Sequence, residues 1–236
     1  MKLLDLPPDL RDRRMFGFFD DFEWYLSPHR WTSLSADAGT SVAAAATAVG
    51  GTVVLTTGAV DNSECALGTT VKLFRPADDK PLVFDARLQY AEAAVNAANL
   101  FAGFADVLTT ADLLQDNGNG PKASFFGAGL FKVDGDSAWR CVSARGALQT
   151  VTAGVASAGG PAPQTVRVEI QPVDATNAEV TFYVDDLPLR DLAGLPVKHT
   201  LTLTGFASLQ AGVFAKAGSA TSETISVDYI AAYQLR

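Results

Sequence analysis

The chain is poor in the residue types that carry most protein chemistry. Only two cysteines and two histidines occur among its 236 residues, and charged residues make up 19%. Two cysteines cannot staple a chain of this length into a disulfide scaffold, and they lie too far from the two histidines to show zinc-ligand spacing. Cys65 and Cys141 each lie beside apolar residues. We therefore expect two buried free thiols and folding in a reducing cytosol.

Positive charge and long apolar runs are also scarce. The chain has 18 Lys and Arg against 26 Asp and Glu, a net charge of −8. This balance disfavours general nucleic-acid binding, which draws most of its affinity from phosphate neutralisation. No run approaches the roughly 18 apolar residues of a membrane helix, and the proline-interrupted first eight residues do not predict a secretory leader. We expect neither a nucleic-acid nor a membrane partner.

What the chain does contain is alternation. Apolar and polar residues alternate over 82–90, 165–171 and 180–185, and no segment shows sustained helical periodicity. A period of two is typical of strands with one buried face, and about a dozen short strands predict an all-β, antiparallel two-sheet sandwich. The predicted strands are 16–22, 52–57, 70–74, 82–90, 99–107, 124–133, 138–144, 147–152, 165–171, 180–185, 200–204, 209–215 and 225–234.

The connections between these strands are rich in turn-forming residues. Asp134-Gly135 predicts a hairpin turn, and residues 116–121 (DNGNGP) form a strong turn cluster. Residues 109–115 predict a single helical turn with a Thr cap. Small residues over 36–48 predict a loop, a mobile edge or a short helix, and the Gly/Ala/Ser/Pro segment 153–163 predicts a surface loop.

The first fifteen residues differ from the rest of the chain. They contain two prolines and a charged run at 12–14, and they show no repeating apolar face. We interpret 1–15 as an N-terminal arm, either a frayed terminus or a segment that orders on a partner. Residues 16–236 are predicted to form one sandwich domain.

The order of several short motifs resembles a known family. In the final third, TVRVEI (165–170), VTFYVDDLPL (180–189), LQAGVF (209–214) and ISVDYI (225–230) resemble the end of a concanavalin A-like (laminin-G-like) jelly roll, with Asp186 in place of the usual turn glycine. In the amino-terminal half, FFDDF (18–22), DN (61–62), PLVFDAR (81–87) and NLFAGF (99–104) resemble lectin-like jelly rolls encoded among tailed-bacteriophage head genes. The resemblance spans roughly residues 16–235.

This resemblance implies a structural role. Small jelly-roll proteins of such phages decorate the outside of the capsid as cement proteins. The chain would then be made in the host cytoplasm, bind the major capsid protein as a dimer or trimer on the virion exterior, and need no cofactor. Apolar and basic residues of the arm are the predicted capsid contacts: Leu3, Leu4, Leu6, Arg11, Arg13 and Arg14.

A second hypothesis is a lectin-like carbohydrate-binding module, displayed on a virion or elsewhere, that recognises a glycan such as one on a cell surface. Lectins of the legume type hold calcium beside the sugar, and the oxygen-rich loop residues Asp116, Asn117 and Asn119 are candidates for a calcium-assisted site. The alternative is plain turn chemistry, and we predict no resident metal. The three tryptophans are either sugar platforms or core residues: Trp24, Trp31 and Trp139.

An enzyme is the weakest hypothesis. Glucan hydrolases of this fold carry Glu-x-Asp-x-x-Glu on one strand, and the chain lacks this run. The adjacent Asp20 and Asp21 would point to opposite faces of a strand, so they are interpreted as a solvated strand start. Neither His29 nor His199 lies in a nucleophile motif. We predict a protein that adheres rather than one that breaks bonds.

Overall fold

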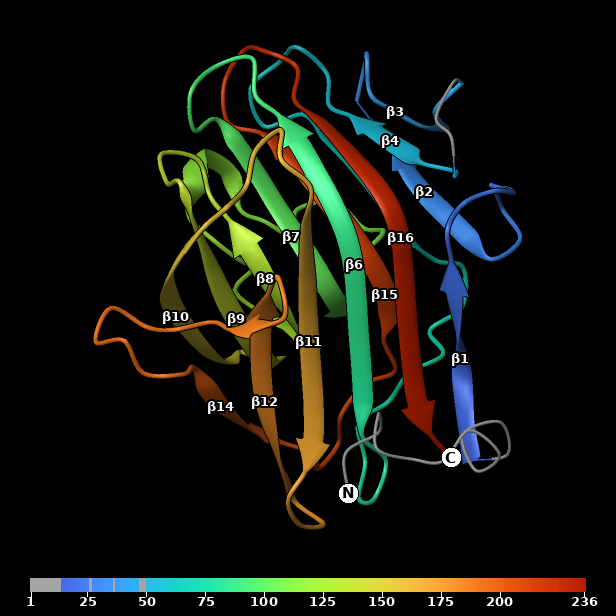
Figure 1. Ribbon diagram of the computed structural model, residues 1–236, viewed down its shortest axis with the longest axis vertical. Helices are drawn as coiled ribbons and strands as arrows, with labels where there is room; N and C mark the ends of the chain where they lie inside the picture. Colours follow the sequence, from blue (N-terminus) through green and yellow to red (C-terminus); the bar gives the residue numbers. More distant parts are fainter. Residues whose placement is uncertain (1–13, 26, 36, 47–49) are drawn as a thin grey trace.

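The computed structural model describes residues 14–25, 27–35, 37–46 and 50–236. Its elements are strands β1 to β16 and one 3₁₀ turn, η2 (Asp116–Gly118), and the strands form two antiparallel sheets packed face to face (Figure 1). The predicted all-β sandwich is therefore confirmed. Within the described ranges, no helix is long and apolar enough to cross a lipid bilayer.

Sheet A, the nearer sheet in Figure 1, contains the strands whose sequences alternate most clearly. In β12 every second residue is buried, as a strand with one solvated face requires. The long strand β16 pairs with β6 along one edge and with β4 and then β1 along the other. The main path runs β13 (Leu187–Pro188), β12 (Asn177–Val184), β11 (Gln164–Pro172), β6 (Leu82–Ala91), β16 (Thr224–Leu235), β4 (Val53–Thr56) and β3 (Ser41–Ala44), with β1 (Met15–Asp20) beside β16 and β14 (Lys198–Thr202) beside β12.

Sheet B lies behind sheet A and follows a different burial pattern. All residues of β5, β7 and β15 are buried, so these strands show no alternation between solvent and core. A strand covered on both faces has this property. The order is β10 (Leu148–Ser157), β9 (Ala138–Gly146), β8 (Phe125–Lys132), β7 (Ala98–Ala105), β15 (Gln210–Ala217), β5 (Glu64–Thr69) and β2 (Trp31–Ser35).

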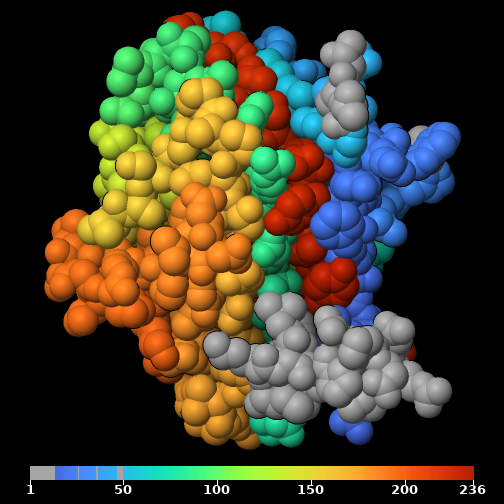
Figure 2. All heavy atoms as spheres, in the orientation of Figure 1, coloured from blue at the N-terminus to red at the C-terminus, as the bar shows by residue number. Residues whose placement is uncertain are grey.

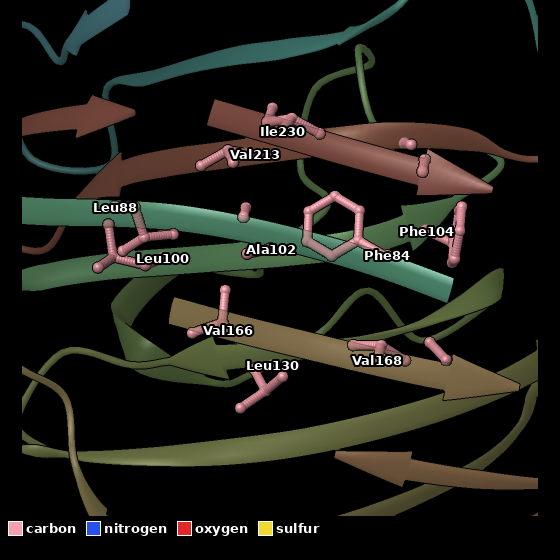
Figure 3. Close-up of a cluster of buried hydrophobic side chains, with 14 of the residues drawn as sticks. Phe84, Leu88, Leu100, Ala102, Phe104, Leu130, Val166, Val168, Val213 and Ile230 are labelled. Atoms are coloured by element: carbon pink, nitrogen blue, oxygen red, sulfur yellow. The ribbon is translucent and has the colours of Figure 1, made fainter. Parts of the chain in front are cut away.

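The main hydrophobic core fills the space between the two sheets. Phe84 of β6 and Val168 of β11 come from sheet A, and Leu100 of β7 and Leu130 of β8 come from sheet B (Figure 3). All four side chains are at most 2% exposed. Burying a large apolar side chain stabilises a fold by about 1.5–3 kcal/mol relative to leaving it in water, so this layer is the main source of stability.

A second apolar cluster covers the outer face of sheet B. Phe101 of β7, Phe131 of β8 and Phe214 of β15 point away from the main core. Leucines from the segment that joins β7 to β8 pack on these rings: Leu108, Leu113 and Leu114. This segment, residues 106–124, is called here the covering segment. It explains why the central strands of sheet B are buried on both faces.

A row of glycines lets the covering segment approach sheet B closely. Gly68, Gly212, Gly103 and Gly129 occupy four neighbouring strands in direct register. A Cβ on Gly212 would lie 2.7 Å from Leu108 Cδ2, and one on Gly68 would lie 2.8 Å from Thr109 Cγ2. Both distances are shorter than a normal carbon contact. Gly68 and Gly212 of this row therefore form the trough in which Leu108 rests.

Among the residues that the structure describes, no segment covers the outer face of sheet A in this way. Figure 2 shows this face, on which β11, β6 and β16 form adjacent yellow, green and red bands. Arg167 lies at its centre and contacts the carboxylates of Asp186 at 2.7 Å and Glu169 at 3.3 Å. The outward positions of β11 are thus polar, as its alternating sequence predicted.

The predicted Asp134-Gly135 turn is confirmed, since it joins β8 to β9. Asp185 and Asp186, the second in place of the glycine usual in the jelly rolls that the sequence resembles, have φ of 51° and 62° and join β12 to β13. Aspartate tolerates this left-handed region better than most residues.

One predicted strand was wrong. Residues 70–74 do not form a strand: Phe74 makes an isolated bridge to Leu209, and Val71 and Leu73 are exposed. The strand is instead β5, six residues earlier in the chain, which the sequence did not predict. Because β5 is buried on both faces, it lacks the period-two pattern by which half-buried strands are recognised.

Smaller corrections concern the connections. For 36–48 the alternatives were a loop, a mobile edge or a short helix, and residues 41–44 form strand β3 at the edge of sheet A. The surface loop predicted from residue 153 begins later because β10 extends to Ser157. Strand β2 was also missed. Residues 109–115 form turns rather than a helical turn, because their leucines anchor the covering segment to sheet B.

Candidate functional site

The end of the covering segment folds into a small hairpin on the outer face of sheet B. Leu114 and Pro121 form a β-bridge, and the backbone N–H of Gln115 donates to the Gly120 carbonyl at 2.8 Å. The N–H of Lys122 donates to the Leu113 carbonyl, also at 2.8 Å. Turn η2 forms the tip, with Asn117 at a φ of 57°. We call residues 113–122 the site hairpin.

A hollow of about 420 Å³ lies between the site hairpin and the outward side chains of β8, β9 and β10. Gln115 and Asn119 line it from the hairpin, Arg140 from β9, and Gln149 from β10. We call this hollow the hairpin groove. Its lining is mostly polar, whereas the hairpin's other side rests on the apolar cluster above sheet B.

The amide side chains of the groove are held by their nitrogen atoms. Gln115 Nε2 donates to the Pro121 carbonyl at 2.6 Å, and Gln149 Nε2 donates to the Lys122 carbonyl at 2.5 Å. No hydrogen bond from another described residue reaches the Oε1 atom of either side chain. These two oxygens are therefore free to accept hydrogen bonds from a ligand.

Arg140 adds a donor to the groove. Its Nε lies 2.8 Å from Asp136 Oδ2, and the guanidinium is partly exposed. This hydrogen bond contributes to a lowered pKa of Asp136, against the opposing effect of burial. Because a guanidinium carries five N–H donors, the contact with Asp136 leaves others directed to solvent or a ligand. Val151 of β10, 47% exposed, supplies an apolar patch beside it.

The structure places the three predicted loop residues at the hairpin tip, but only Asn119 lines the groove. Asn119 Nδ2 donates to the Asp116 carbonyl at 2.8 Å, and the Asn117 N–H donates to Asn62 Oδ1 at 3.1 Å. The Asp116 carboxylate instead turns to the Lys216 ammonium, at 2.6 Å. Among the described residues, no group of three or more His, Cys, Asp or Glu is placed to hold a metal ion.

Sequence reasoning missed the other groove residues. Gln115, Arg140 and Gln149 lie in three separate segments, and each is an ordinary polar residue beside a turn or on the outward face of a strand. The spacing of Gln149 and Val151, two residues apart on β10, places both on one face of that strand but marks no site by itself. The buried Lys216 and its acidic partners Glu64 and Asp112 were missed as well.

The predicted capsid contacts are not tested by the structure. Leu3, Leu4, Leu6, Arg11 and Arg13 lie outside the described residues. Arg14 is described and exposed just before β1. Capsid binding, self-association and a place on the virion exterior therefore stay predictions.

The three tryptophans divide between core and surface. Trp31 and Trp139 are 1% and 0% exposed, and both belong to the core. Trp24 is 83% exposed in the connection between β1 and β2. It borders a second, shallow hollow of about 370 Å³, together with Phe19 and Glu23. Trp24 is thus the one tryptophan available to a ligand. It precedes β2, which is the edge strand of sheet B opposite β10 and the hairpin groove.

The groups that resemble catalytic residues have structural partners. Burial lowers the pKa of His199 to about 4 and raises the pKa of the Cys141 thiol to about 12, so their 3.8 Å contact joins two neutral groups. Asp20, predicted to be solvated, is largely buried and accepts hydrogen bonds from Arg30 and the Trp31 indole, both at 2.9 Å. Cys65 and Cys141 are free and buried.

Comparison with known proteins places the fold. No known family profile and no curated protein sequence matches the chain. A protein of unknown function from Shewanella oneidensis MR-1 is 14% identical, with a TM-score of 0.57 over 98% of this chain and 95% of that one. The carbohydrate recognition domain of Emp47p is 12% identical (TM-score 0.57, 93% and 96% covered), and peanut lectin is 11% identical (TM-score 0.54, 94% and 98% covered).

The protein has a legume lectin-like, concanavalin A-like sandwich fold. This likeness supports the lectin part of the sequence resemblance, and no finding supports the bacteriophage part. Identities this low show the fold alone. The same fold also occurs in an enzyme: the endo-β-1,4-glucuronan lyase of Trichoderma reesei is 9% identical, with a TM-score of 0.54 over 91% of this chain and 94% of that one. Fold similarity is therefore compatible with binding or with catalysis.

Proposed function

We propose that this protein binds a carbohydrate in the hairpin groove. The observation that carries the proposal is the groove itself, in which side chains from the site hairpin, β9 and β10 converge on one hollow. Two of the solved structures that share the fold are a carbohydrate recognition domain and a lectin. The fold alone does not assign the activity, but it makes a sugar the first ligand to test.

The chemistry of the groove suits a polyhydroxylated ligand. A sugar hydroxyl both donates and accepts, so it can donate to Gln115 Oε1 or Gln149 Oε1 and accept from the Arg140 guanidinium. The two glutamines are held in place by their nitrogen atoms, and this pre-organisation reduces the entropy lost on binding. Val151 can contact a C–H face of the ring. Each neutral hydrogen bond contributes a net binding free energy of about 0.5–1.5 kcal/mol, so several are needed for useful affinity.

The lining favours binding over bond cleavage. Glycoside hydrolysis requires two carboxyl groups that flank the scissile bond, and the described residues that line the groove include no Asp or Glu. They also include no His, Tyr or Lys that could serve as a general base for a lyase reaction. The carboxylate of Asp136, which contacts the lining residue Arg140, is engaged by that guanidinium. A ligand in this groove would be held and released unchanged.

A glycan array followed by calorimetric titration of the hits tests the proposal. Ala147 lines the groove and is exposed, so Ala147→Trp should fill the hollow without removing a structural hydrogen bond. We expect this variant to lower affinity for the best glycan by about tenfold or more, because it introduces a steric clash. Leu148→Trp is the matched control. Leu148 is 69% exposed and does not line the groove, so this variant should bind like the parent.

A Trp24→Ala variant separates the groove from the exposed tryptophan. If the groove is the site, Trp24→Ala keeps the parent's affinity while Ala147→Trp loses it. The reverse result would place the sugar on the β1–β2 connection and overturn the proposal. A chain that binds no glycan on the array, at protein concentrations that detect millimolar affinity, would overturn it as well.

A further inference from the structure

Lys216 is a buried cation next to the site hairpin. It lies near the end of β15, on the outer face of sheet B, and its side chain is only 1% exposed. Lysine is almost never buried to this degree unless its charge is paired. An isolated ammonium in this position would be strongly unfavourable, because it would lose its hydration without compensation. The groups around Lys216 must therefore compensate the charge of its ammonium.

Four oxygen atoms surround the Lys216 ammonium. Nζ lies 2.6 Å from Asp116 Oδ1, 3.0 Å from the Leu114 carbonyl oxygen, 3.1 Å from Asp112 Oδ1 and 3.3 Å from Glu64 Oε2. Three of these oxygens belong to carboxylates. An ammonium has only three N–H donors, so the arrangement resembles the oxygen shell around a cation more than an ordinary ion pair.

The oxygen shell joins two parts of the fold. Glu64 lies on β5, directly opposite Lys216 in the pairing of β5 with β15. Asp112, Leu114 and Asp116 belong to the covering segment. The Asp112 N–H also donates to both Glu64 carboxylate oxygens at 3.1 Å. Both members of the Lys216–Glu64 pair on sheet B therefore hold the base of the site hairpin. Lys216 does so through its ammonium, and Glu64 does so through its carboxylate.

We propose that the Lys216 ammonium is a built-in cation that holds the site hairpin in place from outside the groove lining, so the hairpin needs no metal ion for its position. The link to ligand binding rests on the proposed function, whereas the role in ordering the hairpin does not. Asp116 is adjacent to Gln115, the residue that lines the groove from the hairpin's first strand. By holding the Asp116 carboxylate, the Lys216 ammonium therefore also holds the neighbouring Gln115, which forms part of the groove wall.

The electrostatics agree with a permanently charged lysine. Burial alone lowers the pKa of an ammonium, but hydrogen bonds to Asp116 and Asp112 and the charge of Glu64 together raise the pKa of Lys216 above its ordinary value. Calcium sites use six to eight oxygens at about 2.3–2.6 Å. Here the carboxylate of Asp116, a candidate calcium ligand under the lectin hypothesis, is already paired with the ammonium.

A second buried lysine provides the matched control. The Lys132 side chain on β8 is also fully buried, with Nζ 2.8 Å from Glu92 Oε1 and 2.9 Å from the Ala98 carbonyl. It holds a different segment, the connection between β6 and β7. Replacing Lys132 by methionine therefore also removes a buried ammonium, but it leaves the site hairpin's own contacts intact.

Hydrogen exchange followed by mass spectrometry or NMR tests the proposal without any ligand. The reporters are the backbone amides of Asp112, Gln115 and Lys122, which close the base and the two sides of the hairpin. In Lys216→Met we expect these amides to exchange about tenfold faster or more, because the local opening becomes easier. In Lys132→Met they should exchange as in the parent. Treatment of the parent with EDTA, followed by gel filtration, should change nothing.

Three results would overturn the proposal: unchanged exchange in Lys216→Met, equal acceleration in Lys132→Met, or acceleration in the EDTA-treated parent. If Lys216→Met does not fold, Asp116→Asn replaces it, since the Asp116 side chain is 55% exposed and its loss is tolerated more easily. The same amides should then exchange faster, by a smaller factor, and unchanged exchange would again overturn the proposal. If the hairpin loosens as expected while no glycan binds, the proposed function fails and the role of Lys216 stands.

Discussion

The two sheets face the same core but differ in what lies on their outer sides. Among the described residues, no segment covers the outer face of sheet A, and its side chains form ion pairs such as Lys198–Glu179 at 2.9 Å. Sheet B carries the covering segment, whose leucines bury Phe101, Phe131 and Phe214. Surface ion pairs contribute about 0–1 kcal/mol, whereas a buried aromatic contributes several times more. The outer face of sheet B should therefore matter far more for stability.

This difference also separates the places where the molecule can carry a site. A sheet face exposed to water offers a shallow polar surface. A segment packed on a sheet instead creates a concave edge, bounded on one side by the segment and below by the sheet. The hairpin groove lies at that edge, beside β9 and β10, where the covering segment ends. The comparison of the two outer faces can be tested by substitutions that are matched between them.

Phe214→Ala should have the largest effect. Phe214 is fully buried under the covering segment, and a Phe→Ala change in a core destabilises by about 3–5 kcal/mol through lost burial and a cavity. Tyr183→Ala, an aromatic truncation on the outer face of sheet A, removes a contact with Arg167 at 4.6 Å. It should cost about 1 kcal/mol or less. Urea unfolding monitored by fluorescence measures both. Equal losses would show that the covering segment adds little stability.

Gly212→Ala should have the next largest effect. A Cβ at this position would meet the Leu67 carbonyl oxygen and lie 2.7 Å from Leu108 Cδ2. Overpacking of this kind costs about 1–3 kcal/mol, and contact with the rigid backbone favours the upper part of that range. Ser226→Thr adds a methyl group to an outward position of β16 in sheet A and should stay within about 0.5 kcal/mol of the parent. A neutral Gly212→Ala would mean that the trough can widen freely.

Acid should weaken the core that both sheets share, by a smaller amount. His199 on β14 of sheet A contacts Ser143 Oγ of sheet B at 3.1 Å and Thr152 Oγ1 at 3.0 Å, and burial lowers its pKa to about 4. The unfolded chain, with a pKa near 6.5, therefore gains a proton before the folded chain does. Stability is complete above pH 6.5 and is lost as the pH falls toward 4, by about 2 kcal/mol between pH 7 and 5.

Urea titrations at pH 7, 6 and 5 measure this slope. His199→Asn removes the titrating group, so its stability should fall less between pH 7 and 5 than that of the parent. His29→Asn, in the exposed β1–β2 connection, should retain the parent's dependence. If both variants retain it, another group is responsible for the acid sensitivity.

The sequence predicted the strands of sheet A better than those of sheet B. Segments 82–90, 165–171 and 180–185 alternate because one side faces water, and they correspond to β6, β11 and β12. The segment ECALGT, which forms β5, has no alternation because the covering segment buries its outer side. Its neighbour 70–74 is rich in β-branched and apolar residues, but residues 70–73 are exposed and only Phe74 is buried. The local alternation of polar and apolar residues therefore predicts strands that are buried on one face only. It does not predict a strand whose second face is buried by a segment distant in the sequence.

The candidate site was predicted only in part. Turn-forming residues marked 116–121 as a loop, and Asn119 does line the groove. The same residues suggested a calcium ligand in Asp116, whose partner is instead Lys216, 100 positions later in the chain. No motif connects these two residues, because their contact depends on the register of β15 with its neighbours and on the path of the covering segment.

The sequence by itself determined a two-layer β sandwich, because a period of two leaves apolar stripes that only a facing sheet can bury. Only the tertiary structure decided where the groove lies and which cation holds its wall. Those features arise from contacts such as Lys216 with Glu64, Asp112 and Asp116, residues that are far apart along the chain. A buried charge is stable only where its partners converge, and convergence is a property of the folded chain.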